Sequence, residues 1–252
     1  MKKPVMLLAL MCFAAQALAV DVDVSKVKFD DSTYRVDRAE AGQNPFVALK
    51  KLLGGNKRFL ENKSIRPRQD SSIIKELEAS QAPFAIIVGC SDSRVPNEII
   101  FDQGLGDLFI IRTAGQVSSA ASYGSMEFAA TALKSRLLVV LGHTECGAVA
   151  AAVKRPKNVP GHIVTLINEI KPAALKCEKM KGDHVENTVR QNVIDQVANL
   201  RSLEPTLSEL YASGTLLIVG AIYDINTGKT EFLRETLRDL PDTFKEQAKQ
   251  LK

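Results

Sequence analysis

The chain lacks tryptophan, and it has only three histidines and four cysteines among its 252 residues. Four cysteines are too few for the dense disulfide framework that stabilises a small secreted domain. Beyond residue 19, no uninterrupted apolar run reaches the roughly 18 residues that a membrane-spanning helix needs. The formal charge of +4 falls to about +2 without Lys2 and Lys3, which is too small to favour nucleic acid or an anionic membrane as a partner. We therefore expect a globular protein that binds neither nucleic acid nor membrane.

The first 19 residues are typical of a secretory signal peptide. Lys2 and Lys3 begin it, an uncharged and mostly apolar run fills residues 4–15, and Ala17 and Ala19 form a small-x-small cleavage site. An N-terminal membrane anchor is the alternative, but the apolar run is short for one. We predict a periplasmic or secreted protein, with a signal peptide over residues 1–19 and a single domain over residues 20–252 whose core spans about 45–235.

Removal of that segment would leave three cysteines, Cys90, Cys146 and Cys177. Exported proteins usually pair their cysteines or bind metal with them. One disulfide with a leftover thiol is the plainer interpretation of an odd count. Two metal-bound thiolates with a leftover thiol is the other, and the neighbouring residues have to distinguish them.

Short apolar runs alternate with helical patterns along the chain. Four of these runs have the composition of buried strands: residues 84–89, 108–112, 137–141 and 215–222. A turn at residues 223–228 then precedes a short edge strand at 229–232. The alternation predicts an α/β fold, with a mostly parallel central sheet of four to five strands flanked by helices and an N-terminal helical arm.

At the amino end, residues 20–43 are polar and charged and have no sustained period, so we expect an extended arm. Residues 44–62 have a helical pattern, which Gly54 and Gly55 are expected to interrupt. The predicted helical arm is therefore broken near its middle.

Three further expectations concern the second half of the chain. A helix over residues 162–176 should kink or break at Pro172. Cys177, in a lysine-rich stretch, is expected to be a free thiol at an exposed helix end. Residues 233–251 should form one charged amphipathic helix.

Unusual side chains follow two of the predicted strands. Cys90, Asp92 and Arg94 follow the first, and His143 and Cys146 follow the third. Ligands collect at the carboxyl ends of strands in an open parallel sheet, so these groups converge if the two strands are neighbours. Two thiolates and an imidazole suit zinc. Alternatively, each cysteine is a small core residue, and Asp92 with Arg94 is a helix cap or a surface ion pair.

Taken together, these motifs resemble the β-class carbonic anhydrases. The resemblance rests on residues 90–95 (CSDSRV), 101–109 (FDQGLGDLF), 142–147 (GHTECG), 221–224 (AIYD) and 227–228 (TG). It covers residues 45–235, and the motifs are far more specific jointly than singly. It implies that Cys90, His143 and Cys146 are zinc ligands, with one zinc ion per chain, and that Asp92 and Arg94 are a catalytic dyad. In some family members the aspartate is a fourth ligand that closes the site, and in others it pairs with the arginine.

The resemblance also implies a substrate pocket and an oligomer. Gln81 matches a glutamine that hydrogen-bonds the zinc-bound ligand, and Phe109 and Phe128 match aromatic residues that line the carbon dioxide pocket. Ile87 stands where some regulated members have a tryptophan of a bicarbonate inhibitory site, which puts that regulation in doubt. Family members form homodimers or homotetramers with active sites near the interface.

The function implied is reversible hydration of carbon dioxide to bicarbonate and a proton, through a zinc-bound hydroxide. Two alternatives stay open. Related proteins act on carbon disulfide or carbonyl sulfide with similar residues, and tunnel shape would distinguish them. An exported zinc-binding or redox-sensing protein without catalysis is the other, although Arg94 and Gln81 have no purpose in such a site.

Overall fold

The computed structural model describes residues 38–249, so the predictions for residues 1–37 and 250–252 lie outside it. A five-stranded sheet with the order β2-β1-β3-β4-β5 occupies its centre. The strands are β1 (Ala85–Cys90), β2 (Leu108–Thr113), β3 (Leu137–His143), β4 (Leu217–Tyr223) and β5 (Thr230–Phe232). The first four are parallel, and β5 pairs antiparallel with β4. The predicted mostly parallel α/β sheet is thus confirmed.

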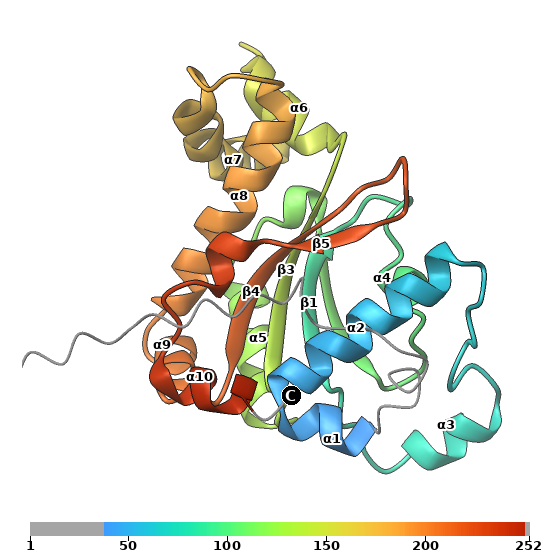
Figure 1. Ribbon diagram of the computed structural model, residues 1–252. Coiled ribbons are helices and arrows are strands. Elements are labelled where there is room, and N and C mark those ends of the chain that lie inside the picture. Colours follow the sequence, from blue (N-terminus) through green and yellow to red (C-terminus); the bar gives the residue numbers. More distant parts are fainter. Residues whose placement is uncertain (1–37, 250–252) are drawn as a thin grey trace, which may run out of the picture.

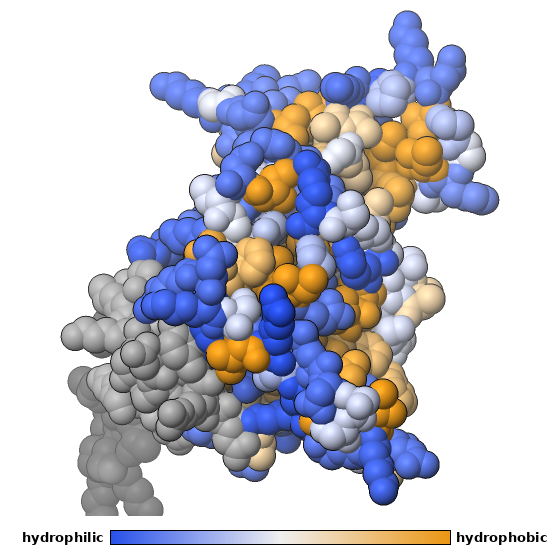
Figure 2. Space-filling view, turned by 90° about the vertical axis from the view of Figure 1, so that its right-hand side faces the viewer, coloured by the Kyte–Doolittle hydropathy of each residue, from blue (hydrophilic) through white to orange (hydrophobic). Residues whose placement is uncertain are grey.

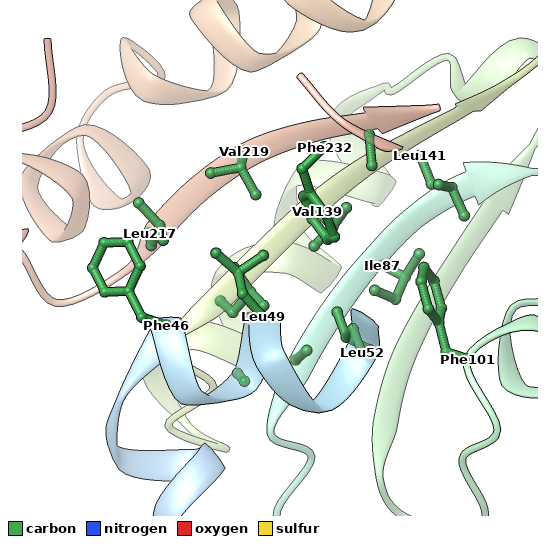
Figure 3. Packing of buried hydrophobic residues seen from close by; sticks show 14 of the residues in the cluster. Phe46, Leu49, Leu52, Ile87, Phe101, Val139, Leu141, Leu217, Val219 and Phe232 are labelled. Carbon is green, nitrogen blue, oxygen red and sulfur yellow. The ribbon is translucent and has the colours of Figure 1, made fainter. Parts of the chain in front are cut away.

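One face of the sheet is covered by α2 (Pro45–Leu60), together with α1 (Arg38–Gln43), α4 (Asn97–Ile100) and α10 (Asp242–Lys249) (Figure 1). The side chain of Asn44 accepts a hydrogen bond from the Phe46 N–H and begins α2, with Pro45 in the first turn. Figure 3 shows Phe46, Leu49 and Leu52 pointing from α2 onto the strands. This apolar stripe fixes the helix against the sheet.

The expectation of a break at Gly54 and Gly55 is wrong, because α2 runs through both residues. A Cβ atom at Gly55 would lie 1.7 Å from the carbonyl oxygen of Phe101. Glycine at this position lets the loop at Phe101 lie close to α2, and it does not end the helix. Likewise, residues 38–43 of the expected extended arm form α1.

The other face of the sheet is covered by α5 (Ala120–Thr131), α8 (His184–Arg201) and α9 (Thr206–Ala212). Val189, Val193, Val197 and Leu200 recur on one side of α8 at helical spacing, and all four are buried. Gly220 of β4 lets α8 lie close, since a Cβ atom there would be 2.6 Å from Val193 Cγ1.

Replacing Gly220 with alanine should therefore destabilise the protein. The added methyl group overlaps Val193, and such overpacking costs about 1–3 kcal/mol of unfolding free energy. Urea unfolding of Gly220→Ala and of a Gly42→Ala control measures the cost. Gly42 lies in α1 with no atom within 4 Å of an added Cβ, so its replacement should be neutral or slightly stabilising. Equal stability of the two variants would contradict this packing account.

At the carboxyl ends of the strands, α6 (Gly147–Lys154), α7 (Ile163–Cys177) and the first turns of α8 enclose a separate apolar cluster. These helices lie at the top of Figure 1, beyond the strand ends. Of the kink or break expected at Pro172, the break is not found, because α7 is continuous across this residue, and the kink stays a prediction. Cys177 is free as predicted, but it is buried and only 1% exposed because the end of α7 packs on α8.

The carboxyl-terminal segment is also divided differently from the prediction. A 3-10 turn, η4 (Arg234–Leu237), follows β5, and α10 begins only after Pro241. Leu233, Leu237 and Leu240 are buried along this irregular stretch, so packing on the sheet replaces a single helix. The remaining elements are α3 (Ser72–Leu77) and η3 (Ala114–Gln116). Within residues 38–249, every helix is too short or too polar to cross a membrane.

Candidate metal centre

Three potential metal ligands meet at the carboxyl edge of the sheet. Cys90 ends β1, His143 ends β3, and Cys146 precedes α6. Because β1 and β3 are paired neighbours, the sulfur atoms of both cysteines and a ring nitrogen of His143 all lie within 4.8 Å of one another. All three side chains are buried. The predicted convergence of these residues is therefore what the fold produces.

The hydrogen bonds around these side chains suit a metal ligand set. The Nδ1 atom of His143 lies 2.8 Å from the Thr144 carbonyl oxygen, whereas its buried Nε2 atom has no partner. A ring nitrogen fixed to a backbone carbonyl leaves the other as an electron-pair donor, which is the usual arrangement of a metal-bound histidine. Two thiols and one such imidazole match zinc, and three protein ligands are typical of catalytic zinc sites.

Backbone amides also favour a thiolate at Cys90. The N–H groups of Gly115 and Asp92 donate to Cys90 Sγ over 3.3 and 3.4 Å. A hydrogen bond from the Cys146 thiol lowers the pKa of Cys90 against the opposing effect of burial, and these two amides lower it further. The pKa of Cys146 is raised because it keeps the proton that it shares with Cys90. Burial alone would lower the pKa of His143, but the Cys90 thiolate beside it raises it.

Asp92 and Arg94 form a charge-assisted pair beside the three ligands. Arg94 Nε and Nη2 donate to the two carboxylate oxygens of Asp92 over 2.9 and 2.8 Å, and this bidentate bond holds the pKa of Asp92 well below its usual range. The Oδ2 atom of Asp92 lies 3.9 Å from His143 Nε2. The carboxylate therefore sits next to the ligands while paired with arginine, and its role as a fourth ligand stays a prediction.

Arg112 holds the loop that carries Cys90 and Asp92. Its Nε atom donates to the Cys90 carbonyl over 3.0 Å, and its Nη2 atom donates to the Asp92 carbonyl over 2.7 Å. These two contacts to backbone carbonyls give Arg112 a structural role.

Sequence reasoning missed the turn between His143 and Cys146. Glu145 in this turn has a φ of 55°, in the left-handed region that residues other than glycine rarely adopt. Its N–H donates to Glu186 Oε1 over 2.9 Å, and Asn226 Nδ2 donates to its carboxylate over 3.2 Å. No local signal indicated these contacts, because Glu186 and Asn226 lie far from Glu145 in the sequence.

The three predicted pocket residues do not reach the ligands of their own chain. Gln81 is exposed and precedes β1, whose length places it about 16 Å or more from Cys90 at about 3.3 Å per residue. Phe109 pairs with Ile86, so about four residues, or about 13 Å, separate its level on the sheet from that of Cys90. Phe128 is 51% exposed and lies beside Phe109, with 6.5 Å between the ring centroids.

Comparison with known proteins agrees with this geometry. The family described as carbonic anhydrase matches residues 85–230, which contain all three candidate ligands. A carbonic anhydrase of Mycolicibacterium smegmatis is 40% identical over 200 residues, covering 78% of this chain and 97% of that protein. A Coccomyxa β-carbonic anhydrase solved with acetazolamide has a TM-score of 0.60 at 27% identity, covering 73% of this chain and 86% of the other.

A second solved relative leads to the same assignment. The tetrameric β-carbonic anhydrases of Sordaria macrospora are represented by a structure with a TM-score of 0.57 at 25% identity, which covers 74% of this chain and 96% of the other. The family match spans more than half of the 252 residues, and the parallel sheet presents a Cys-His-Cys set at its carboxyl edge. The chain therefore belongs to the β-class carbonic anhydrases.

Proposed function

We propose that this protein hydrates carbon dioxide reversibly to bicarbonate and a proton with one zinc ion per chain. The observation that carries the proposal is the buried Cys90, His143 and Cys146 set, within 4.8 Å, beside the Asp92–Arg94 pair. Zinc bound there would supply a Lewis acid that lowers the pKa of a coordinated water from about 15.7 towards about 7.

The chain's own residues orient the water that attacks carbon dioxide. Because Arg94 holds Asp92 ionised, the carboxylate can accept a hydrogen bond from the attacking water and fix its direction. Arg112 keeps the Asp92 backbone in place during this step. Carbon dioxide is small and apolar, so it needs aromatic or aliphatic side chains beside this water more than it needs charged groups.

Stopped-flow carbon dioxide hydration, with zinc quantified on the same samples across a range of pH, tests the proposal. We expect about one zinc per chain and a rate that rises with pH. Full activity in metal-free protein would refute it. Zinc without hydration would favour the binding or redox-sensing alternative, and faster turnover of carbonyl sulfide or carbon disulfide would favour the related hydrolases.

We further propose that two copies pair along β2, which is one of the two edge strands of the sheet formed by residues 38–249. Five of its six residues are partly buried and only Arg112 is exposed, whereas β1 and β3 are buried throughout. Unpaired edge strands with apolar side chains readily pair with another strand. Figure 2 shows hydrophobic patches among hydrophilic residues on the right-hand side of the molecule in Figure 1. The tetrameric relatives from Sordaria macrospora support an oligomer.

Such pairing would also bring the predicted pocket residues of one copy close to the metal ligands of the other copy. Across a two-fold axis the β2 strands would be antiparallel, so the amino half of one lies beside the carboxyl half of the other. Phe109 of one copy would then approach the metal ligands of the second copy, with the neighbouring Phe128. Gln81, at the same end of the sheet as these aromatic residues, would approach with them.

Phe128→Glu is expected to weaken this association. A charge placed at a half-exposed aromatic position would have to be buried against the second copy, which is unfavourable without a partner. Sedimentation velocity at several concentrations should give a dimer Kd at least about tenfold higher than that of the unaltered protein. A matched Met180→Glu control, at a 53% exposed position in the loop between α7 and α8, should leave the Kd unchanged. Unchanged association in Phe128→Glu would argue against the β2 interface.

Export is a separate proposal, supported by the sequence of residues 1–19. Cell fractionation followed by amino-terminal sequencing tests it. The expected result is an extracytoplasmic protein that begins at Val20, which would also set the start of the single domain proposed for residues 20–252.

A further inference from the structure

The turn that carries two of the three candidate metal ligands makes a hydrogen bond with one side chain of α8, in addition to its bonds with Tyr223, Ile225 and Asn226 at and after the end of β4. Glu145 adopts its left-handed conformation directly before Cys146 and two residues after His143. Its backbone N–H donates to Glu186 Oε1 over 2.9 Å. Because a residue with a side chain rarely adopts this conformation, the turn depends on contacts made by its neighbours.

Glu186 is itself fixed by the start of a long helix. Asp183 is the N-cap of α8, and its carboxylate accepts the Glu186 N–H over 2.9 Å. A carboxylate in the first turn of a helix is also stabilised by the helix dipole. The buried Val189 and Val193 then anchor α8 against the apolar clusters. Because Glu186 is fixed on this packed helix, its hydrogen bond holds the Glu145 turn in place relative to α8.

The same turn also contacts the dyad. Arg94 Nη2 donates to the Glu145 carbonyl over 3.3 Å while it donates to Asp92 Oδ2 over 2.8 Å. The Glu145 peptide groups are therefore bonded on one side to Glu186 and on the other to Arg94. A displaced turn would move the Cys146 ligand and the Asp92–Arg94 pair together.

We propose that Glu186 is a positioning residue, which holds the Glu145 turn and through it the Cys146 ligand and the Asp92–Arg94 pair. This inference rests on the proposed function, since it concerns the zinc ligands and the dyad of that reaction. Glu186 acts through its carboxylate oxygen as a hydrogen-bond acceptor, so glutamine should replace it better than alanine does.

Glu186→Ala, Glu186→Gln and Glu235→Ala form the test set. Glu235 pairs with Arg190 and also anchors α8, but it contacts neither the ligands nor the turn. Three quantities are measured on each protein: zinc affinity by chelator competition, the visible absorption of the Co²⁺-substituted form, and kcat and KM for carbon dioxide.

We expect Glu186→Ala to lower zinc affinity and kcat by about tenfold each, as loss of a residue that orients metal ligands typically does, and to alter the Co²⁺ spectrum. Glu186→Gln should recover most of both losses, and Glu235→Ala should match the unaltered protein in all three measurements. If the zinc affinity and the kcat of Glu186→Ala both stay within about twofold of those of the unaltered protein, the inference is overturned.

A coupled substitution keeps the test decisive if Glu186→Ala folds poorly. Glycine adopts the left-handed conformation without cost, so in a Glu145→Gly background the Glu186→Ala change should reduce zinc affinity by less than about threefold. An equal loss in both backgrounds would overturn the inference. If the unaltered protein neither binds zinc nor hydrates carbon dioxide, the proposed function fails; if it does both and Glu186→Ala behaves identically, only this inference fails.

Discussion

Cys146→Ser is expected to abolish zinc binding and carbon dioxide hydration together. A serine hydroxyl is a far poorer zinc ligand than a thiolate, and only Cys90 and His143 would remain of the three ligands that lie within 4.8 Å. Zinc content should fall to less than about a tenth of an ion per chain after dialysis, and kcat/KM should fall by at least about a thousandfold.

The remaining cysteine of the described chain provides the control for this substitution. Cys177 is also buried and free, but it lies at the end of α7 and not among the ligands. Cys177→Ser should therefore keep its zinc and its rate. Zinc measurement by atomic emission and stopped-flow assays on both variants make the comparison. A Cys146→Ser protein that retained full zinc and rate would contradict the proposed site.

Asp92→Asn should separate catalysis from metal binding. The amide group of asparagine offers one acceptor where the carboxylate offers two, so the bidentate bond with Arg94 is lost. Its NH₂ group also cannot accept a hydrogen bond from the attacking water. We expect zinc content to stay near that of the unaltered protein while kcat/KM falls by about 10²–10³-fold, a typical size for loss of such a group.

Asp70→Asn is the matched control for the dyad. Asp92 accepts the backbone N–H of Arg94, two positions later, and Asp70 accepts that of Ser72 in the same way, but Asp70 is exposed and far from the candidate ligands. A rate within about threefold of the unaltered protein in Asp92→Asn would remove Asp92 from the mechanism.

Asp92 should not cause the rise of the hydration rate with pH. Because the Arg94 contact lowers the pKa of Asp92, this carboxylate stays ionised as the pH rises through neutrality.

The candidate metal ligands could be predicted from the sequence because Cys90 and His143 each lie at the end of a recognisable apolar strand, and Cys146 follows three residues after His143. Cys90 directly follows a run of residues that is buried in β1, and His143 follows another that is buried in β3. Hydrophobic periodicity identifies such strands, and the carboxyl end of a parallel strand is where ligands collect. The motifs around Cys90 and Cys146 then gave the family.

The errors arose where long-range packing outweighs local preference. Gly55 suggested a break, but it lies inside α2 because the chain at Phe101 approaches it closely. Cys177 lies in a lysine-rich stretch, yet it is buried because α7 ends against α8. A local pattern reports how polar a segment is, and it does not report which element packs on it.

The sequence alone predicted the class of fold, because apolar runs alternate with helical patterns, and it predicted the three candidate ligands and the Asp92–Arg94 pair, because short contiguous motifs contain them. Only the tertiary structure decided that β1 and β3 are neighbours, that Arg112 secures the Cys90 loop, and that Glu186 secures the Glu145 turn. The physical reason is that these contacts join residues separated by 20 to 50 positions or more. Their formation depends on strand order and on helix docking, which no single segment specifies.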